Sequence, residues 1–258
     1  MFKEERLRDI VELINKNSKV YVKELAKRFD RSESSIRLDL SELEERGLIV
    51  RTHGGAMMAN GAFEKIELRK SVLSSRDNLY KEEKQRIGSA AVDLINDGDS
   101  VLIDGGSTTL YVAKNLGKKR GLTVISTSVH ILPSLMETPD IKIFLTGGFV
   151  LREYEELVGE FSLDSLFKFK PDHTILGIDG ISLEQGLSSC EPLIAPLKRK
   201  MIATGKDVII VSDHSKFGRE CLFPVAELRD IQTIITDNKV DKSYVDSLQL
   251  QGISVLIA

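Results

Sequence analysis

Cysteine is scarce in this chain, and long apolar runs are missing. The 258 residues contain two cysteines, Cys190 and Cys221, a number and spacing that indicate neither a disulfide framework nor a zinc site. No segment approaches the roughly 18 uninterrupted apolar residues of a membrane helix, and the charged N-terminus is not followed by one. We therefore expect a soluble cytoplasmic protein without a membrane partner, in which both cysteines are small apolar fillers.

An excess of basic charge is also missing. Lys and Arg number 36 against 39 Asp and Glu, a formal net charge of −3. This balance excludes a nonspecific basic coat for nucleic acid, but it allows a local basic surface. The length suits one small domain plus one of ordinary size. No cluster of Cys, His and carboxylate residues has the spacing of metal ligands, so we expect no metal and no cofactor.

Residues 1–56 have the apolar periodicity of short helices. The pattern predicts helices over residues 4–17, 22–29 and 33–46, then a strand over 48–53 whose turn is Gly54-Gly55-Ala56. Three helices with such a strand, or wing, are typical of a winged helix-turn-helix domain. The helices alone also fit a small protein-binding module.

The third predicted helix has two unlike faces. Ile36, Leu40 and Leu43 fall on one side, whereas short hydroxyl side chains lie opposite them beside Arg37. Hydroxyls donate to phosphates and a guanidinium reads guanine edges, so this face suits the major groove of double-stranded DNA. The candidate DNA-binding residues are Arg31, Ser32, Ser34, Ser35, Arg37, Leu38, Ser41, Arg51, His53 and Gly54.

The chain after residue 56 divides into a linker with helical character over residues 57–84 and a larger domain over 85–258. In the larger domain, apolar strands end in small or polar turns, and helical segments lie between many of them. This alternation predicts an α/β domain with a mostly parallel sheet, and ligands of such sheets bind beyond the carboxyl ends of the strands. The strands are expected at 101–103, 123–125, 143–145, 174–176 and 208–211.

The turn Asp104–Thr109 is the best candidate for an anion site. Its glycines allow close backbone approach, its hydroxyls donate, and a helix follows it. The same turn is often only a tight turn with a helix cap. The other strand ends add sugar-hydroxyl acceptors and a phosphate-binding lysine. The candidate effector-binding residues are Asp104, Gly105, Gly106, Ser107, Thr108, Thr109, Ser126, Thr127, Ser128, Gly147, Gly148, Arg152, Asp179, Lys198 and Lys216.

Several of these segments together resemble the DeoR family of bacterial transcription regulators. The resemblance rests on residues 22–26, 35–40 and 53–56, and on later blocks such as 178–180 and 213–218. Leu38 departs from the family habit of a second arginine at that place. The resemblance implies a larger domain similar to the ribose-5-phosphate isomerase and CoA-transferase folds, bound by a phosphorylated sugar or polyol. It also implies a repressor of a carbohydrate-catabolism operon that binds its DNA operator as a homo-oligomer, a dimer or tetramer.

Two other functions fit parts of the sequence. The first is an isomerase-like sugar-phosphate enzyme with an appended DNA-binding module, in which Asp104, Asp179, Glu191 or Lys216 would act as acid or base. Nothing in their spacing requires catalysis, so we expect a regulator and not an enzyme. The second is a redox-switched regulator that uses the two cysteines.

Overall fold

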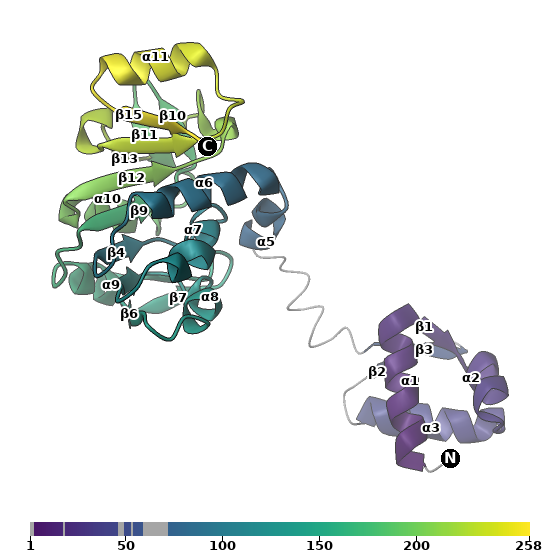
Figure 1. Cartoon of the computed structure of the whole chain (residues 1–258). Coiled ribbons are helices and arrows are strands. Elements are labelled where there is room, and N and C mark those ends of the chain that lie inside the picture. Colours follow the sequence, from purple (N-terminus) through teal and green to yellow (C-terminus); the bar gives the residue numbers. More distant parts are fainter. Residues whose placement is uncertain (1–2, 18, 46–48, 53, 59–71) are drawn as a thin grey trace. The chain divides into compact units, whose positions relative to one another are not determined.

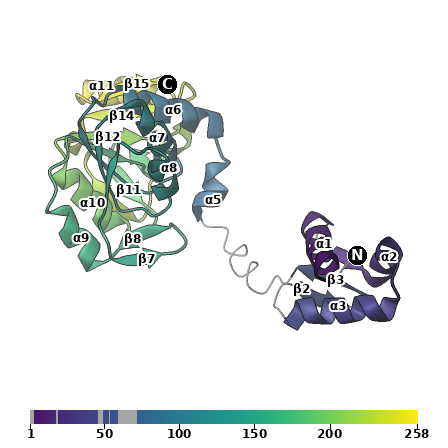
Figure 2. The ribbon, with the colours of Figure 1, turned by 60° about the horizontal axis from the view of Figure 1, so that its bottom comes forward.

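The computed structural model describes residues 3–17, 19–45, 49–52, 54–58 and 72–258. The chain separates into two compact units, Met1–Lys70 and Ser71–Ala258, shown in Figure 1 and from a second direction in Figure 2. The linker expected over residues 57–84 therefore differs from the observed division. Of its described residues, 57 and 58 belong to a strand of the first unit, and 72–84 belong to the second unit, where helices α5 and α6 pack.

The first unit is a three-helix domain with a small antiparallel sheet. The three expected helices are present, and their apolar stripes form one core that includes Leu7, Ile10, Leu25, Ile36 and Leu40. The sheet has the order β1-β3-β2, with β3 in the middle. The elements are α1 (Lys3–Asn17), β1 (Lys19–Tyr21), α2 (Val22–Phe29), α3 (Glu33–Glu45), β2 (Ile49–Thr52) and β3 (Gly55–Met58).

The wing differs from its expected form in one respect. Gly55 and Ala56 begin strand β3 and do not form the turn, which instead includes Gly54 at a φ of +84°. Strand β1, too short to be recognised from periodicity, pairs with β3 and opposes Val20 to Ala56. A Cβ on Gly55 would lie 2.1 Å from the carbonyl oxygen of Val20, so glycine permits this pairing.

A buried ion pair joins the first and third helices. Arg6 on α1 donates to both carboxylate oxygens of Asp39 on α3, at 2.7 and 3.0 Å, and both side chains are buried. Such bidentate geometry offsets the cost of removing two charges from water. The pair therefore fixes the orientation of α3 relative to α1, and the outer face of α3 remains exposed.

The second unit is built on a seven-stranded sheet in which every pairing is parallel. Its order is β15-β14-β12-β9-β4-β5-β6. The five expected strands are the five consecutive strands β12-β9-β4-β5-β6 of this sheet, which confirms the α/β class. The strands are β4 (Ser100–Ile103), β5 (Thr123–Ser126), β6 (Lys142–Leu145), β9 (His173–Leu176), β12 (Asp207–Val211), β14 (Thr233–Thr236) and β15 (Ser254–Ile257).

Helices cover both faces of this sheet. Because successive strand residues face opposite sides, Leu102 belongs to one apolar core while Val101 and Ile103 belong to the other. The core on one face is lined by α6 (Lys81–Asp93), α7 (Thr109–Asn115) and α8 (Leu132–Met136). The core on the other face is lined by α9 (Glu160–Leu166), α10 (Ala195–Thr204) and α11 (Lys242–Leu250). The remaining helices are α5 (Val72–Asp77) and the short 3₁₀ turns η1 (Leu116–Lys118), η2 (His214–Lys216) and η3 (Leu228–Asp230).

Two small antiparallel sheets complete the second unit and correct the expectation for the cysteines. Strands β7 (Phe149–Leu151) and β8 (Glu156–Val158) form a hairpin, and β10 (Gly180–Ser182), β11 (Gly186–Ser189) and β13 (Phe223–Ala226) form the other sheet. Cys190 follows β11 and Cys221 precedes β13, and the two form a disulfide with Cα atoms 5.0 Å apart. They are not separate fillers, because the pairing of β11 with β13 brings together two cysteines that are 31 residues apart in sequence.

Replacing Asp39 with alanine should destabilise the first unit by roughly 3 kcal/mol or more, because the Arg6 charge stays buried without a partner. Amide hydrogen exchange of α1 in the full chain measures this. The matched control is Glu33→Ala, which removes an exposed partner of Arg37 and should cost less than about 1 kcal/mol. Equal losses in the two variants would contradict the role assigned to the buried pair.

Candidate functional site

The outer face of α3 is free of contacts with the core. The helix begins after Ser32, whose hydroxyl accepts a hydrogen bond from the Ser35 amide at 3.2 Å. Ser34, Arg37 and Leu38 are exposed, and Leu38 is 71% accessible despite being apolar. Small polar groups, an arginine and one apolar side chain on the exposed face of a helix are the side chains that contact bases in the major groove of DNA.

The wing lies against the same helix. Arg51 on β2 donates to the Ser41 hydroxyl at 2.6 Å, and Ser41 in turn donates to the carbonyl of Arg37 at 2.9 Å. The Arg51 amide also donates to Glu44. This brings the basic side chains of wing and helix to one surface. Among the other candidates, Arg31 and Gly54 are exposed, Ser35 and Ser41 are half-buried, and His53 lies outside the described residues.

The order of strands in the second unit predicts where a ligand site lies on its sheet. From β4 the chain continues to β5 and β6 on one side, whereas β9, β12, β14 and β15 lie on the other. Strands β4 and β9 therefore flank the point where the direction of winding reverses, which is where open parallel sheets bind ligands. Asp104 directly follows β4, and Gly177 directly follows β9.

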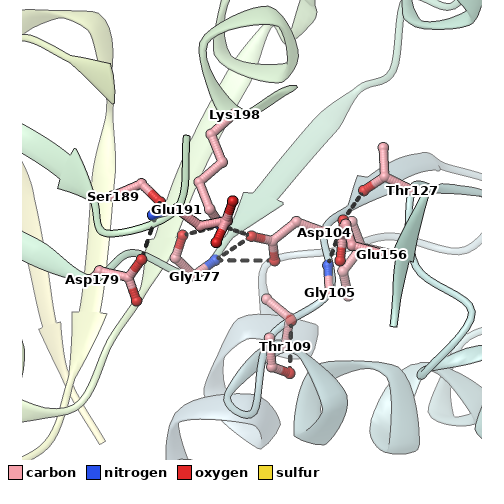
Figure 3. A network of polar contacts seen from close by, with 12 residues as sticks. Asp104, Gly105, Thr109, Thr127, Glu156, Gly177, Asp179, Ser189, Glu191 and Lys198 are labelled. Carbon is pink, nitrogen blue, oxygen red and sulfur yellow. Dashed lines mark hydrogen bonds and ion pairs between the residues drawn. The ribbon is translucent and has the colours of Figure 1, made fainter. Parts of the chain in front are cut away.

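A buried ion pair holds these two strand ends together, as Figure 3 shows. The ammonium of Lys198, on α10, pairs with Asp104 and donates to the Gly177 carbonyl at 2.9 Å. The Gly177 amide donates to Asp104 at 3.1 Å. Burial alone would lower the pKa of Lys198, but the adjacent Asp104 raises it above its ordinary value. Lys198 is therefore charged, and it shapes the floor of the site.

Glu156 supports the loop that follows β4. It is fully buried at the start of β8 and accepts hydrogen bonds from the Thr127 hydroxyl and, at 3.3 Å, from the Gly105 amide. Burial, reinforced by the charge of Asp104, raises the pKa of Glu156 to about 7. A Cβ on Gly105 would lie 1.9 Å from a Glu156 carboxyl oxygen, so this loop position requires glycine.

A pocket opens above this network. Its walls come from the turns after β4, β9 and β12 and from helices α5 and α6. Seven candidate residues line it: Gly105, Gly106, Ser107, Thr108, Asp179, Lys198 and Lys216. Residues that sequence reasoning did not assign to the site line the rest: Leu73, Arg76, Leu79, Tyr80, Lys84, Tyr154, Gly177, Ile178, Ile194, Val211, Ser212, Asp213 and Ser215.

Three cationic side chains on the wall differ in their partners. Arg76 on α5 pairs with Asp179 at 2.8 Å, and Asp179 also accepts from the Cys190 amide and the Ser189 hydroxyl. Lys84 donates to the Arg76 carbonyl at 2.5 Å. Among the described residues, no carboxylate lies within ion-pair distance of the Lys84 or Lys216 ammonium. Burial lowers the pKa of both lysines, and Asp213 offsets part of that effect.

The remaining candidate effector residues do not line the pocket. Asp104 lies beneath it in the ion pair, and Thr109 caps its own turn by donating to the Gly106 carbonyl. Ser126, Thr127 and Ser128 are buried, and the Ser126 hydroxyl donates to the Ile103 carbonyl and accepts from the Ser128 amide. The Gly147 carbonyl accepts a hydrogen bond from the Ser162 hydroxyl on α9. A Cβ on Gly148 would lie 2.7 Å from the Val158 carbonyl oxygen, and Arg152 is exposed.

Two kinds of signal pointed toward the unassigned residues. Asp213 and Ser215 directly precede Lys216 at the end of β12, where the strand-end rule predicts ligand contacts. Arg76 and Lys84 belong to the segment that was expected to be a linker with helical character, and its place in a pocket wall depends on the tertiary fold. Within the described part of the chain, every helix is too short or too polar to span a bilayer.

Comparisons with known proteins agree with this architecture. The family model "DeoR-like helix-turn-helix domain" matches residues 6–61, and "DeoR C terminal sensor domain" matches residues 80–238. The HTH-type transcriptional repressor GlcR of Bacillus subtilis is 33% identical over 257 residues, covering 100% of this chain and 97% of that protein. The glycerol-3-phosphate regulon repressor of Escherichia coli is 31% identical over 233 residues and 90% of both chains.

One solved structure similar to this chain is the ribose 5-phosphate isomerase of Plasmodium falciparum, at 19% identity, 52% coverage of each chain and a TM-score of 0.39.

A winged helix-turn-helix unit followed by a parallel-sheet unit that matches a sensor-domain model is the architecture of a transcription regulator. Both domains match one family in the expected order. The chain belongs to the DeoR family of transcription regulators, which confirms the resemblance seen in its sequence.

Glu156→Gln should abolish one component of the pH dependence of stability. The pKa of Glu156 is raised in the folded state from 4.5 to about 7, so the unfolded chain loses this proton first. Wild-type stability should therefore fall, relative to the variant, by roughly 3 kcal/mol as the pH rises from 4.5 to 7, and then level off. Thermal melting across this range measures it. The exposed Glu137→Gln should parallel the wild type, and a constant difference between wild type and Glu156→Gln would contradict the burial argument.

Proposed function

We propose that this regulator is a repressor of a carbohydrate operon, and that a phosphorylated sugar or polyol in the pocket controls its affinity for the operator. The observation that carries the proposal is the pair Lys84 and Lys216. Both are largely withdrawn from water and have no carboxylate partner among the described residues, yet they face the same pocket as Gly105–Thr108. Buried cations normally have a counter-charge, and a bound anion would supply it.

The chemistry of the pocket favours a phosphate ester over a plain sugar. The loop after β4 offers backbone amides and the hydroxyls of Ser107 and Thr108, and two lysines add point charges for a dianion. Asp179 and Tyr154 provide acceptors and a donor for sugar hydroxyls. The name of the Escherichia coli relative, which refers to the glycerol-3-phosphate regulon, supports control by a phosphorylated sugar or polyol.

Regulation is favoured over catalysis by the state of two of the four candidate acid–base residues, Asp104 and Asp179. An isomerase needs an acid or base that is free to exchange a proton with the substrate carbon. Here Asp104 is committed to Lys198, and Asp179 to Arg76. The chain would act in the cytoplasm, where bacterial operators lie, as a non-enzymatic sensor.

Helix α5 is the element through which the ligand would act. It is the first described element after the boundary at residue 70, and it contributes Leu73 and Arg76 to the pocket. Its first amide donates to the Glu153 carbonyl at 2.8 Å. A ligand that binds better to one position of Arg76 and Lys84 shifts α5, and thereby the chain that leads to the DNA-binding unit.

Arg37→Ala should weaken binding to DNA selected by the wild-type chain from a random pool by about 1–3 kcal/mol, because one base-edge contact is lost. Arg37 is exposed, so the fold should be unchanged. Fluorescence anisotropy at fixed salt measures the affinity. Arg8→Ala, which removes an exposed arginine of α1, is the control. If both variants bind alike, α3 is not the reading helix.

Melting of the full chain with hexose phosphates, pentose phosphates and glycerol 3-phosphate should reveal one class that raises the midpoint by several degrees. A ligand at 100 times its Kd adds about 2.7 kcal/mol, and the unphosphorylated compounds should have no such effect. Lys216→Met should abolish the shift, whereas Lys170→Met, at an exposed position, should keep it. A shift that survives Lys216→Met would place the anion elsewhere.

A further inference from the structure

One end of the second unit exposes more apolar surface than its fold requires. Four phenylalanines on or beside β6, β7 and α9 are largely accessible: Phe144 at 47%, Phe149 at 68%, Phe161 at 81% and Phe167 at 69%. Leu145 and Val150 in the same strands are also exposed. We call these six residues the phenylalanine surface. None of them lines the pocket at the switch point.

The elements that carry this surface are tied to one another. Ser162 and Ser165 on α9 donate to the carbonyls of Gly147 and Thr146, the residues between β6 and β7, both at 2.8 Å. Phe149 on β7 opposes Val158, which lies just before α9. Both views place β7 and α9 at the same end of the unit (Figure 1, Figure 2). The six residues therefore share one end of the domain.

The strand β6 adds an open sheet edge at this end. It is the last strand of the seven-stranded sheet, and within the described residues it pairs only with β5. An edge strand presents a row of backbone donors and acceptors that can pair with another chain. Phe144 and Leu145, consecutive in β6, point to opposite faces of the sheet, so apolar surface flanks the edge on both sides.

We propose that the phenylalanine surface and the β6 edge form the interface with a second copy of this chain. With about 200 Å² of surface per phenylalanine, the four exposed fractions amount to roughly 500 Å², and a stable interface buries about 800 Å² per partner. The phenylalanines thus supply the apolar centre of an interface of ordinary size.

The surface suits a copy of itself better than a foreign protein. A two-fold axis places the same patch on both sides, so an apolar centre meets an apolar centre. Asp164 on α9 and Lys168 just after it are both exposed beside Phe161 and Phe167, and such an axis can set the acid of one copy opposite the base of the other. A β6 edge can pair antiparallel with its symmetry mate. The arrangement would give two reading helices to one assembly, as a two-fold operator needs.

Sedimentation velocity of the full chain tests the interface directly. The wild type should form a dimer or a larger assembly, and Phe161→Glu should raise its dissociation constant by about thirtyfold or more. The matched control is Leu250→Glu, because Leu250 ends α11, is 89% exposed and lies outside the surface. Unchanged far-UV circular dichroism spectra in both variants would show that the subunit fold is intact, because loss of the dimer by itself lowers the thermal midpoint.

A second variant, Phe149→Glu on the neighbouring hairpin, should act in the same direction as Phe161→Glu. A monomeric wild type would assign the surface to another protein and overturn the proposal. So would an assembly that survives both phenylalanine variants, or one that Leu250→Glu disrupts equally. These readouts need no ligand and no DNA, so they fail or succeed independently of the proposed sensing function.

Discussion

The ion pair between Lys198 and Asp104 is the interaction on which the second unit depends most. It joins helix α10 to the end of β4, and through Gly177 it fixes the end of β9 as well. These two strand ends flank the reversal of the parallel sheet, so the pair closes the floor beneath the pocket. The charges of the floor neutralise each other, so in the proposed function the wall lysines Lys84 and Lys216 supply the positive charge for an anionic ligand.

The position of Arg76 connects this pocket to the rest of the chain. Its ion pair with Asp179 holds α5 against the turn after β9, and Asp179 is itself held by backbone and hydroxyl donors near the disulfide. Because α5 follows the domain boundary, the proposed ligand would act on the start of the second unit without crossing the sheet, and no long chain of contacts within that unit is required.

Much of the fold could be predicted from the sequence because its signals are local. The apolar periodicity around Ile36, Leu40 and Leu43 identifies α3, and runs such as Val208–Val211 identify buried strands. What is not local was missed. The pairing of Cys190 with Cys221 depends on β11 lying beside β13, and β1 is too short to have a period. The wall lysine Lys84 and the buried Glu156 have no local signature, since their environment arises from segments distant in sequence. The turn of Ser126–Ser128 resembled a ligand site, but its hydroxyls are consumed by buried strand contacts.

The most direct test of the central claim is amide hydrogen exchange of residues 72–77 in the full chain, with and without each sugar phosphate that raises the thermal midpoint. We expect that such a ligand alters exchange in α5 and in the turn after β4, and that the same ligand changes operator affinity. In Arg76→Gln the turn should still respond, whereas the change in operator affinity should be lost. A ligand that alters operator affinity while exchange in α5 stays unchanged would contradict the account.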